Sequence, residues 1–205
     1  MKLDWEKMGG LIPAVVQDVD TAEVLMVGFM DEAALESTRE TGRVTFFSRS
    51  RQQLWTKGET SGNFLELVDL AVDCDADTLL VIARPAGPVC HLGTQTCFGG
   101  ETRAPLSFLG RLDRLIKTRE TERPEGSYTS RLFESGAKRI GQKVGEEAVE
   151  TALAAVAGER DELLDEAADL VYHLLVLLRA GELSLSELAT RLGERHGNPA
   201  RRPGD

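Results

Sequence analysis

The stretch that decides the fold of the first half of the chain spans residues 73–98. It contains, in order, Asp73-Cys74-Asp75-Ala76-Asp77, the apolar run Leu79-Leu80-Val81-Ile82-Ala83, Cys90-His91 and Cys97-Phe98. All three cysteines of the protein and one of its three histidines lie here. Thiolate, imidazole and carboxylate groups are the side chains that bind metal ions in proteins. The clustering therefore predicts a metal-dependent active site.

The residues around this stretch predict an α+β domain with a mainly antiparallel sheet. Apolar runs rich in β-branched and aromatic residues predict strands at 12–18, 23–29, 44–48, 65–73 and 79–83. Asp31 is a suitable N-cap for a helix over 32–41, which Gly42 would end. The first two strands are separated by a short turn and are expected to form a hairpin.

The strand pattern stops near residue 99, where 99–105 has the composition of a linker. Beyond it, apolar residues at helical spacing predict helices at 106–119, 128–135, 137–157, 161–180 and from Ser184 to about 196. We expect two domains, 1–103 and 104–205, of which the second is an all-α helical bundle. The tail, 197–205, is expected to be frayed.

Composition excludes several classes of partner. A net charge of -10 and a pI near 4.9 argue against nucleic acid and against an anionic membrane surface. The sequence has no signal segment and no apolar run near the length of a membrane span. We therefore expect a cytoplasmic protein, in which an odd number of cysteines indicates thiolate chemistry or metal binding before disulfides.

The cysteines favour zinc. Cys74, Cys90 and Cys97 follow the spacing C-x15-C-x6-C, which differs from the close pairs of zinc fingers. Three soft ligands select zinc and leave a fourth position for water, whose pKa zinc lowers toward about 7. His91 would be a general base or proton shuttle. The alternative is that the cysteines are small buried apolar residues.

The aspartates favour a separate, harder cation. If 73–77 is extended, then Asp73, Asp75 and Asp77 share one face while Cys74 points to the other. Three carboxylates suit magnesium. The alternative is an acidic, solvated loop that binds no metal.

Basic and hydroxyl side chains upstream predict a phosphate-binding loop in an otherwise acidic protein. The candidate residues are Arg49, Arg51, Trp55, Lys57, Thr60 and Ser61. An ordinary hairpin loop explains the same composition.

Three motifs, at 55–63, 73–77 and 90–98, resemble phosphoribosyl-AMP cyclohydrolase, an enzyme of histidine biosynthesis, and the likeness spans about residues 5–98. The resemblance implies hydrolytic opening of the adenine ring at its N1–C6 bond. It also implies an obligate homodimer, a catalytic base at His91, and magnesium on the aspartates. The implied zinc ligands are Cys74 of one subunit with Cys90 and Cys97 of the other. A nucleoside deaminase is the weaker alternative, because the H-x-E and P-C-x-x-C signature is missing.

The helical half carries a second acidic pattern. Glu147 and Glu150 lie one turn apart on one predicted helix, as do Glu166 and Asp169 on the next. If the helices face each other, the four acids can hold magnesium for phosphate hydrolysis. A solvated acidic face is the alternative, and His173 is expected to be a packed helix residue rather than a ligand.

This pattern resembles phosphoribosyl-ATP pyrophosphohydrolase, a relative of the MazG-type nucleotide pyrophosphatases, over about 107–196. The resemblance implies magnesium on Glu147, Glu150, Glu166 and Asp169. It places Lys138, Arg139 and Lys143 near the triphosphate of the substrate.

Together the two halves resemble a bifunctional histidine-biosynthesis hydrolase. The second domain would release pyrophosphate from phosphoribosyl-ATP, and the first would open the ring of phosphoribosyl-AMP. Two alternatives remain at this point. In the first, only one domain is catalytic. In the second, the chain is a zinc-stabilised binding protein without catalysis, in which a fourth protein ligand would complete the coordination of zinc.

Overall fold

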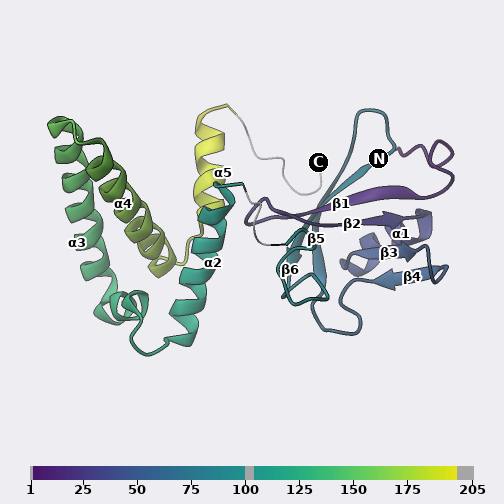
Figure 1. Cartoon of the computed structure of the whole chain (residues 1–205), viewed down its shortest axis with the longest axis horizontal. Helices are drawn as coiled ribbons and strands as arrows, with labels where there is room; N and C mark the ends of the chain where they lie inside the picture. The colour runs from purple at the N-terminus through teal and green to yellow at the C-terminus, as the bar shows by residue number, and fades with distance from the viewer. Residues whose placement is uncertain (1, 100–103, 198–205) are drawn as a thin grey trace. The chain divides into compact units, whose positions relative to one another are not determined.

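The computed structural model describes residues 2–99 and 104–197. They pack into two compact units that divide in sequence between Ser107 and Phe108. Strands and one helix make up the first unit, and helices alone make up the second (Figure 1).

The first unit is a small α+β domain. Its elements are β1 (Ile12–Asp18), β2 (Val24–Met30), α1 (Glu32–Thr41), β3 (Thr45–Ser48), β4 (Gln53–Thr56), β5 (Leu65–Val72) and β6 (Leu79–Pro85). Four strands form a sheet in the order β2-β1-β6-β5, and β3 pairs with β4. Only β1 and β6 run parallel among the neighbouring strands described. The prediction of a mainly antiparallel α+β domain is confirmed.

Alternation along the two central strands builds the core of this unit. Ile12, Ala14 and Val16 are fully buried on β1, and every second residue between them is half-buried. The parallel register sets Ala14 beside Leu79 and Val16 beside Val81, both of which are also fully buried. A period of two thus directs one face of the sheet inward.

Local signals set the ends of α1 as predicted. The Asp31 carboxylate accepts the Ala34 N–H at 2.7 Å, which satisfies one free donor of the first turn. Gly42 ends the helix with a left-handed φ of 67°. Strand β4, by contrast, was not predicted, because two of its four residues are exposed and two are half-buried, and they form a strand through pairing with β3.

The second unit contains α2 (Ser107–Glu122), α3 (Tyr128–Ala157), α4 (Arg160–Ala180) and α5 (Leu185–Arg195). Helix α3 is broken at Gly136, whose φ of 79° and ψ of 168° are open essentially to glycine alone. The break matches the predicted division between helices at 128–135 and 137–157. Ser184 and Glu187 form a capping box that begins α5, so the predicted cap is confirmed.

Residues from three helices make the core of the second unit. Its buried members are Ile116, Leu132, Ile140, Leu175 and Val176. The helical region that was predicted is therefore confirmed. No described helix is both long enough and apolar enough to span a membrane. Most of the predicted linker and tail, 100–103 and 198–205, lies outside the described residues.

Candidate active sites

The acidic segment 73–77 is the turn between β5 and β6, so the extended conformation considered from the sequence is wrong. One carboxylate oxygen of Asp73 accepts the N–H groups of Asp77 and Thr78, each at 3.0 Å. Ala76 has a left-handed φ of 63°, which reverses the chain. The reversal still gathers Asp73, Asp75 and Asp77, because one oxygen from each lies within 4.8 Å of the others.

A lysine that the sequence did not indicate lies on this cluster. Lys7 Nζ is 2.5 Å from Asp75 Oδ2 and 2.6 Å from Asp77 Oδ2. The hydrogen bond from Lys7 holds the pKa of Asp75 below its usual range. Because the Lys7 ammonium already lies between two carboxylates, the three aspartates form a site that suits a cation. Lys7 lies in no motif, and only tertiary structure brings it here.

Two of the three thiols lie together in the segment after β6. Cys90 is buried, and the Leu92 N–H donates to its sulfur at 3.5 Å. This contact, followed by the Thr94 hydroxyl, lowers the pKa of Cys90. Cys97 is exposed as a residue, but partial burial of its thiol and the neighbouring Cys90 raise the pKa of Cys97. Of the two thiols, Cys90 therefore loses its proton more readily than Cys97.

Thr96 anchors this segment to β2. Its hydroxyl donates to the Val24 carbonyl at 2.8 Å, and the Cys97 N–H donates to the Leu25 carbonyl at 2.8 Å. Thr96 is only 4% exposed. It fixes the backbone beside Cys97, a role that sequence spacing alone does not indicate.

Cys74 lies apart from the other two thiols. It is exposed in the β5–β6 turn. Within residues 2–99 and 104–197, two groups of three potential ligands bring their atoms within 4.8 Å, and both consist of carboxylates. One chain therefore does not gather the three sulfurs. His91 is exposed next to the pair, with Nδ1 3.9 Å from the sulfur of Cys90.

The predicted phosphate-binding residues lie on the β3–β4 hairpin and the turn after it. Arg49 stacks over the Phe29 ring at 3.7 Å, and Arg51 lies 5.8 Å from the Trp55 ring. Lys57 is only 8% exposed, and its charge acts on the thiols of the first unit. Thr60 and Ser61 are exposed in the turn that follows.

Gly58 allows this turn to close on itself. Its φ is 91°, and a Cβ there would lie 2.4 Å from the Asn63 backbone. Any other residue would both strain the backbone and collide with it. The glycine therefore helps to set the position of Lys57.

The second acid group lies between α3 and α4. Glu147 and Glu150 of α3 and Glu166 of α4 each offer an oxygen within 4.8 Å of the others. Glu147 is 4% exposed. Asp169, one turn beyond Glu166, is exposed and is not part of that close group. Three of the four predicted ligands are thus gathered.

One lysine partly neutralises this group. Lys143 Nζ is 2.7 Å from Glu147 Oε1 and 3.0 Å from Glu146 Oε2. The hydrogen bond from Lys143 lowers the pKa of Glu147. Burial, followed by the charges of Glu150 and Glu147, raises the pKa of Glu166. The remaining negative charge makes the group suitable for a divalent cation.

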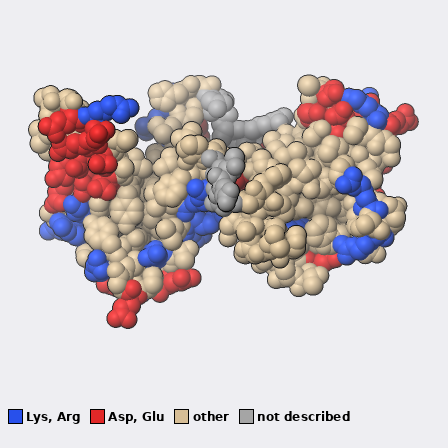
Figure 2. Space-filling view, viewed as in Figure 1, with Lys and Arg blue, Asp and Glu red and all other residues tan. Residues whose placement is uncertain are grey.

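Negative charge extends beyond this group toward the end of the pair where α3 ends and α4 begins (Figure 2). There the Glu159 carboxylate raises the pKa of Glu162. Lys138 and Arg139, the other two residues predicted near the triphosphate, are exposed on α3. The Arg139 guanidinium lies 3.4 Å from the Glu146 carboxylate. The cations therefore line α3 ahead of the acids.

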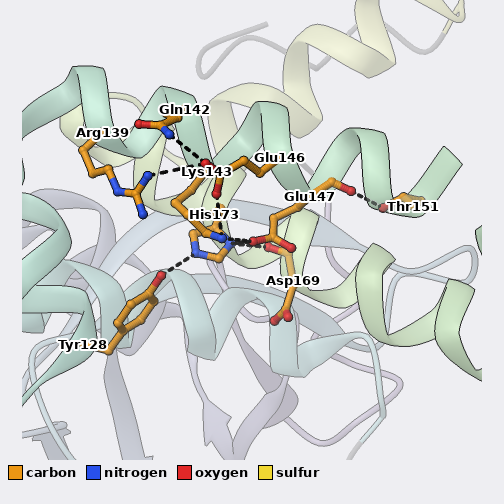
Figure 3. Close-up of polar contacts among 9 residues, drawn as sticks. All are labelled: Tyr128, Arg139, Gln142, Lys143, Glu146, Glu147, Thr151, Asp169 and His173. Carbon is orange, nitrogen blue, oxygen red and sulfur yellow. Dashed lines mark hydrogen bonds and ion pairs between the residues drawn. The ribbon is translucent and has the colours of Figure 1, made fainter. Parts of the chain in front are cut away.

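His173 lies beneath the acids, and Figure 3 shows it between Tyr128 and Glu147. Its Nδ1 is 2.9 Å from the Asp169 carbonyl and 3.7 Å from Glu147 Oε1, and the Tyr128 hydroxyl is 3.0 Å from its Nε2. A neutral ring that carries its hydrogen on Nδ1 donates to the carbonyl and accepts from Tyr128. The prediction of a packed histidine is confirmed. Helical spacing did not indicate Tyr128.

Comparison with known proteins assigns a family to each unit. Residues 26–99 match the family model of phosphoribosyl-AMP cyclohydrolase, and residues 109–196 match that of phosphoribosyl-ATP pyrophosphohydrolase. The chain is 60% identical over 194 residues to the histidine biosynthesis bifunctional protein HisIE of Xanthomonas axonopodis pv. citri (strain 306), which covers 95% of this chain and 93% of that protein.

Two further relatives carry the same description. The protein from Bacteroides thetaiotaomicron is 54% identical over 198 residues, covering 97% of this chain and 98% of its own length. The protein from Escherichia coli O157:H7 is 56% identical over 195 residues, covering 95% and 96% respectively. The chain therefore belongs to the bifunctional histidine-biosynthesis family that joins phosphoribosyl-AMP cyclohydrolase and phosphoribosyl-ATP pyrophosphatase activities in one polypeptide.

Proposed function

We propose that the two reactions take place at the two sites described above, in domains spanning 1–103 and 104–205. The helical domain releases pyrophosphate from phosphoribosyl-ATP, and the α+β domain opens the adenine ring of the phosphoribosyl-AMP that results. The observation that carries the assignment is that each unit gathers its own group of three carboxylates. Both substrates are phosphorylated nucleotides, which need a local cation in a chain of net charge -10.

In the α+β domain, zinc would be held by Cys90 and Cys97 of one subunit and Cys74 of a second. The closeness of the first two thiols and the exposure of Cys74 support this division. Zinc held there would supply Lewis-acid chemistry that lowers the pKa of a water molecule toward about 7. His91 takes up and returns the proton of the attacking water.

The remaining residues of this domain bind the substrate and a second metal ion. Asp73, Asp75 and Asp77 would hold magnesium. The phosphate-binding residues are Arg49, Arg51, Trp55, Lys57, Thr60 and Ser61. Lys57 supports this role, because it is a buried cation that can pair with a phosphate. The turn at Gly58 fixes the position of Lys57.

In the helical domain, Glu147, Glu150, Glu166 and Asp169 would hold magnesium, which neutralises triphosphate oxygens when bound. The raised pKa of Glu166 supports this set, because burial and then the neighbouring carboxylates disfavour its charged form, which a divalent cation would stabilise. Lys138, Arg139 and Lys143 contact the triphosphate. The protein acts as a homodimer in the cytoplasm.

One incubation tests both reactions. The purified chain, with phosphoribosyl-ATP, zinc and magnesium, is expected to yield pyrophosphate and ring-opened product. Cys90→Ser is expected to abolish ring opening and spare pyrophosphate release. Glu166→Ala is expected to leave phosphoribosyl-ATP unconsumed but to open the ring of phosphoribosyl-AMP that is supplied directly. Each activity is the folding control for the other. Loss of both activities in either variant would contradict the two-site assignment.

The shared zinc site needs a second experiment. Cys74→Ala and Cys90→Ala chains are each expected to lack ring opening, and a mixture is expected to recover part of it, because one site of each heterodimer is intact. The zinc content per dimer, measured by elemental mass spectrometry, is expected to be higher in the heterodimer than in either variant alone. Verified heterodimers without recovery would argue against a site shared between subunits.

A further inference from the structure

The N-terminal segment, residues 2–10, is attached to the β5–β6 turn. The Asp4 N–H donates to the Ala76 carbonyl at 2.8 Å. The Lys7 N–H donates to the Asp4 carboxylate at 3.0 Å, which closes a local turn. Leu3 and Trp5 pack against the core of the same unit. Apolar anchoring and this turn together direct Lys7 toward the acids.

Lys7 uses oxygens that a metal ion would need. Its ammonium contacts Oδ2 of both Asp75 and Asp77, two of the three gathered carboxylates. Magnesium binds carboxylate oxygens at about 2.0–2.1 Å and demands near-octahedral geometry. The ammonium nitrogen and the ion cannot both occupy the space between these two oxygens. Binding of the ion therefore requires Lys7 to move.

Charge decides which cation can perform this exchange. Three carboxylates and one ammonium leave a formal charge of about -2, and replacement of the ammonium by a divalent ion leaves about -1. A monovalent ion that replaces the ammonium leaves the formal charge of the cluster unchanged at about -2. The lysine therefore opposes sodium and potassium more effectively than magnesium.

We propose that Lys7 is the resident cation of the Asp73–Asp75–Asp77 cluster, which a divalent metal ion displaces, and that it thereby sets the affinity and the charge selectivity of the site. The inference rests on the proposed function of the aspartates as magnesium ligands. Lys7 precedes residues 26–99, which match the cyclohydrolase family model, so the match does not assign it a role. Displacement removes the Lys7 ion pairs, one of the contacts that hold residues 2–10 against this turn.

Calorimetric titration of the full-length chain with magnesium chloride measures the affinity. Magnesium binding at the Asp73–Asp75–Asp77 cluster is the part of the heat signal that is lost in Asp75→Asn. This difference separates it from magnesium binding at the acids of the helical unit. Lys7→Met is expected to tighten this binding by roughly threefold to tenfold, because it removes two solvent-accessible ion pairs that compete with the metal ion. Lys2→Met, which removes the same charge from the same segment, is the matched control and is expected to leave it unchanged. Pyrophosphate release by each variant confirms folding.

Trypsin provides a readout independent of affinity and activity. It cleaves after lysine, and the bond between Lys7 and Met8 is held against the turn through the Lys7 side chain. Magnesium is expected to accelerate this cleavage, followed by mass spectrometry, in the parent chain and not in Asp75→Asn. Potassium at equal ionic strength is expected to have no such effect.

The outcomes separate the two proposals. Unchanged or weaker magnesium binding in Lys7→Met, with Asp75-dependent binding present in the parent chain, overturns the role of Lys7 and leaves the metal site intact. Slower or unchanged cleavage on addition of magnesium overturns the displacement. Absence of any Asp75-dependent binding overturns the magnesium site itself, and the inference about Lys7 with it.

Discussion

The aspartate turn and the glutamate pair of helices are two acid clusters built by different means. Both gather three carboxylates, and both hold the ammonium of one lysine. In the helical cluster, Lys143 lies on the same helix as Glu147, one turn earlier. In the turn, Lys7 comes from a segment 68 residues away from Asp75. Helix geometry supplies the counter-charge in one case, and tertiary packing supplies it in the other.

Burial makes the two clusters differ in energy. The side chain of Glu147 is 6% exposed, whereas that of Asp75 is 57% exposed. Water and salt screen charges at the surface, so exposed ion pairs contribute little to stability. A buried carboxylate that loses its partner keeps its desolvation cost. Loss of the charge partner of Glu147 is therefore expected to cost more stability than loss of the charge partner of Asp75.

The largest expected effect is on pyrophosphate release. Glu147→Gln removes a buried member of the acid group, and the loss of a ligand that holds the ion is expected to lower kcat by about 10²–10³-fold. Ring opening of phosphoribosyl-AMP is expected to remain. Glu146→Gln is the matched control, since Glu146 also contacts Lys143 but is not part of the group. Equal losses in both variants would contradict the special position of Glu147.

Stability separates the two lysines next. Lys143→Met leaves Glu147 buried without its ion pair and is expected to cost the helical unit about 2 kcal/mol in its free energy of unfolding. Lys7→Met is expected to cause no measurable loss. Urea unfolding followed by circular dichroism reports chiefly the helices, while both tryptophans, Trp5 and Trp55, report the first unit by fluorescence. Small, equal changes in both variants would remove the energetic contrast.

His173 tests whether the helical cluster depends on its support. His173→Leu removes the hydrogen bonds to the Asp169 carbonyl and the Tyr128 hydroxyl, and we expect about tenfold lower pyrophosphate release with weaker magnesium binding. His173→Asn keeps a donor near the position of Nδ1 and is expected to recover part of both. If Leu and Asn variants lose thermal stability equally but bind magnesium like the parent chain, His173 serves packing alone.

The smallest expected effect concerns pH in the absence of metal. The raised pKa of Glu166 means that the folded state holds this proton more tightly than the unfolded state. The parent chain therefore loses stability as pH rises through the usual glutamate range up to the folded pKa, and the deficit persists above it. In EDTA, Glu166→Gln is expected to raise the midpoint of thermal unfolding slightly at pH 7 and not at pH 4. A lower midpoint at pH 7 would contradict an environment in which burial and neighbouring carboxylates disfavour the charged form of Glu166.

Much of the fold was predictable because its signals are local. The caps at Asp31 and Ser184, the end of α1 at Gly42 and the break at Gly136 depend on residues within one turn of the chain. The acid pairs on α3 and α4 followed from helical periodicity. The strand β4 and the turn at 73–77 were not predicted, because pairing with β3 and the β5–β6 reversal depend on the tertiary structure.

The sequence by itself determined the two units, the class of each, and which side chains are available as ligands, because periodicity and capping act over a few residues and donor chemistry belongs to the residue. Tertiary structure alone decided which ligands meet. It brought Cys90 to Cys97 and left Cys74 apart, joined Glu166 to the glutamates of α3, and set Lys7 between two aspartates. Distances between segments follow from the packing of a whole core, which no local pattern encodes.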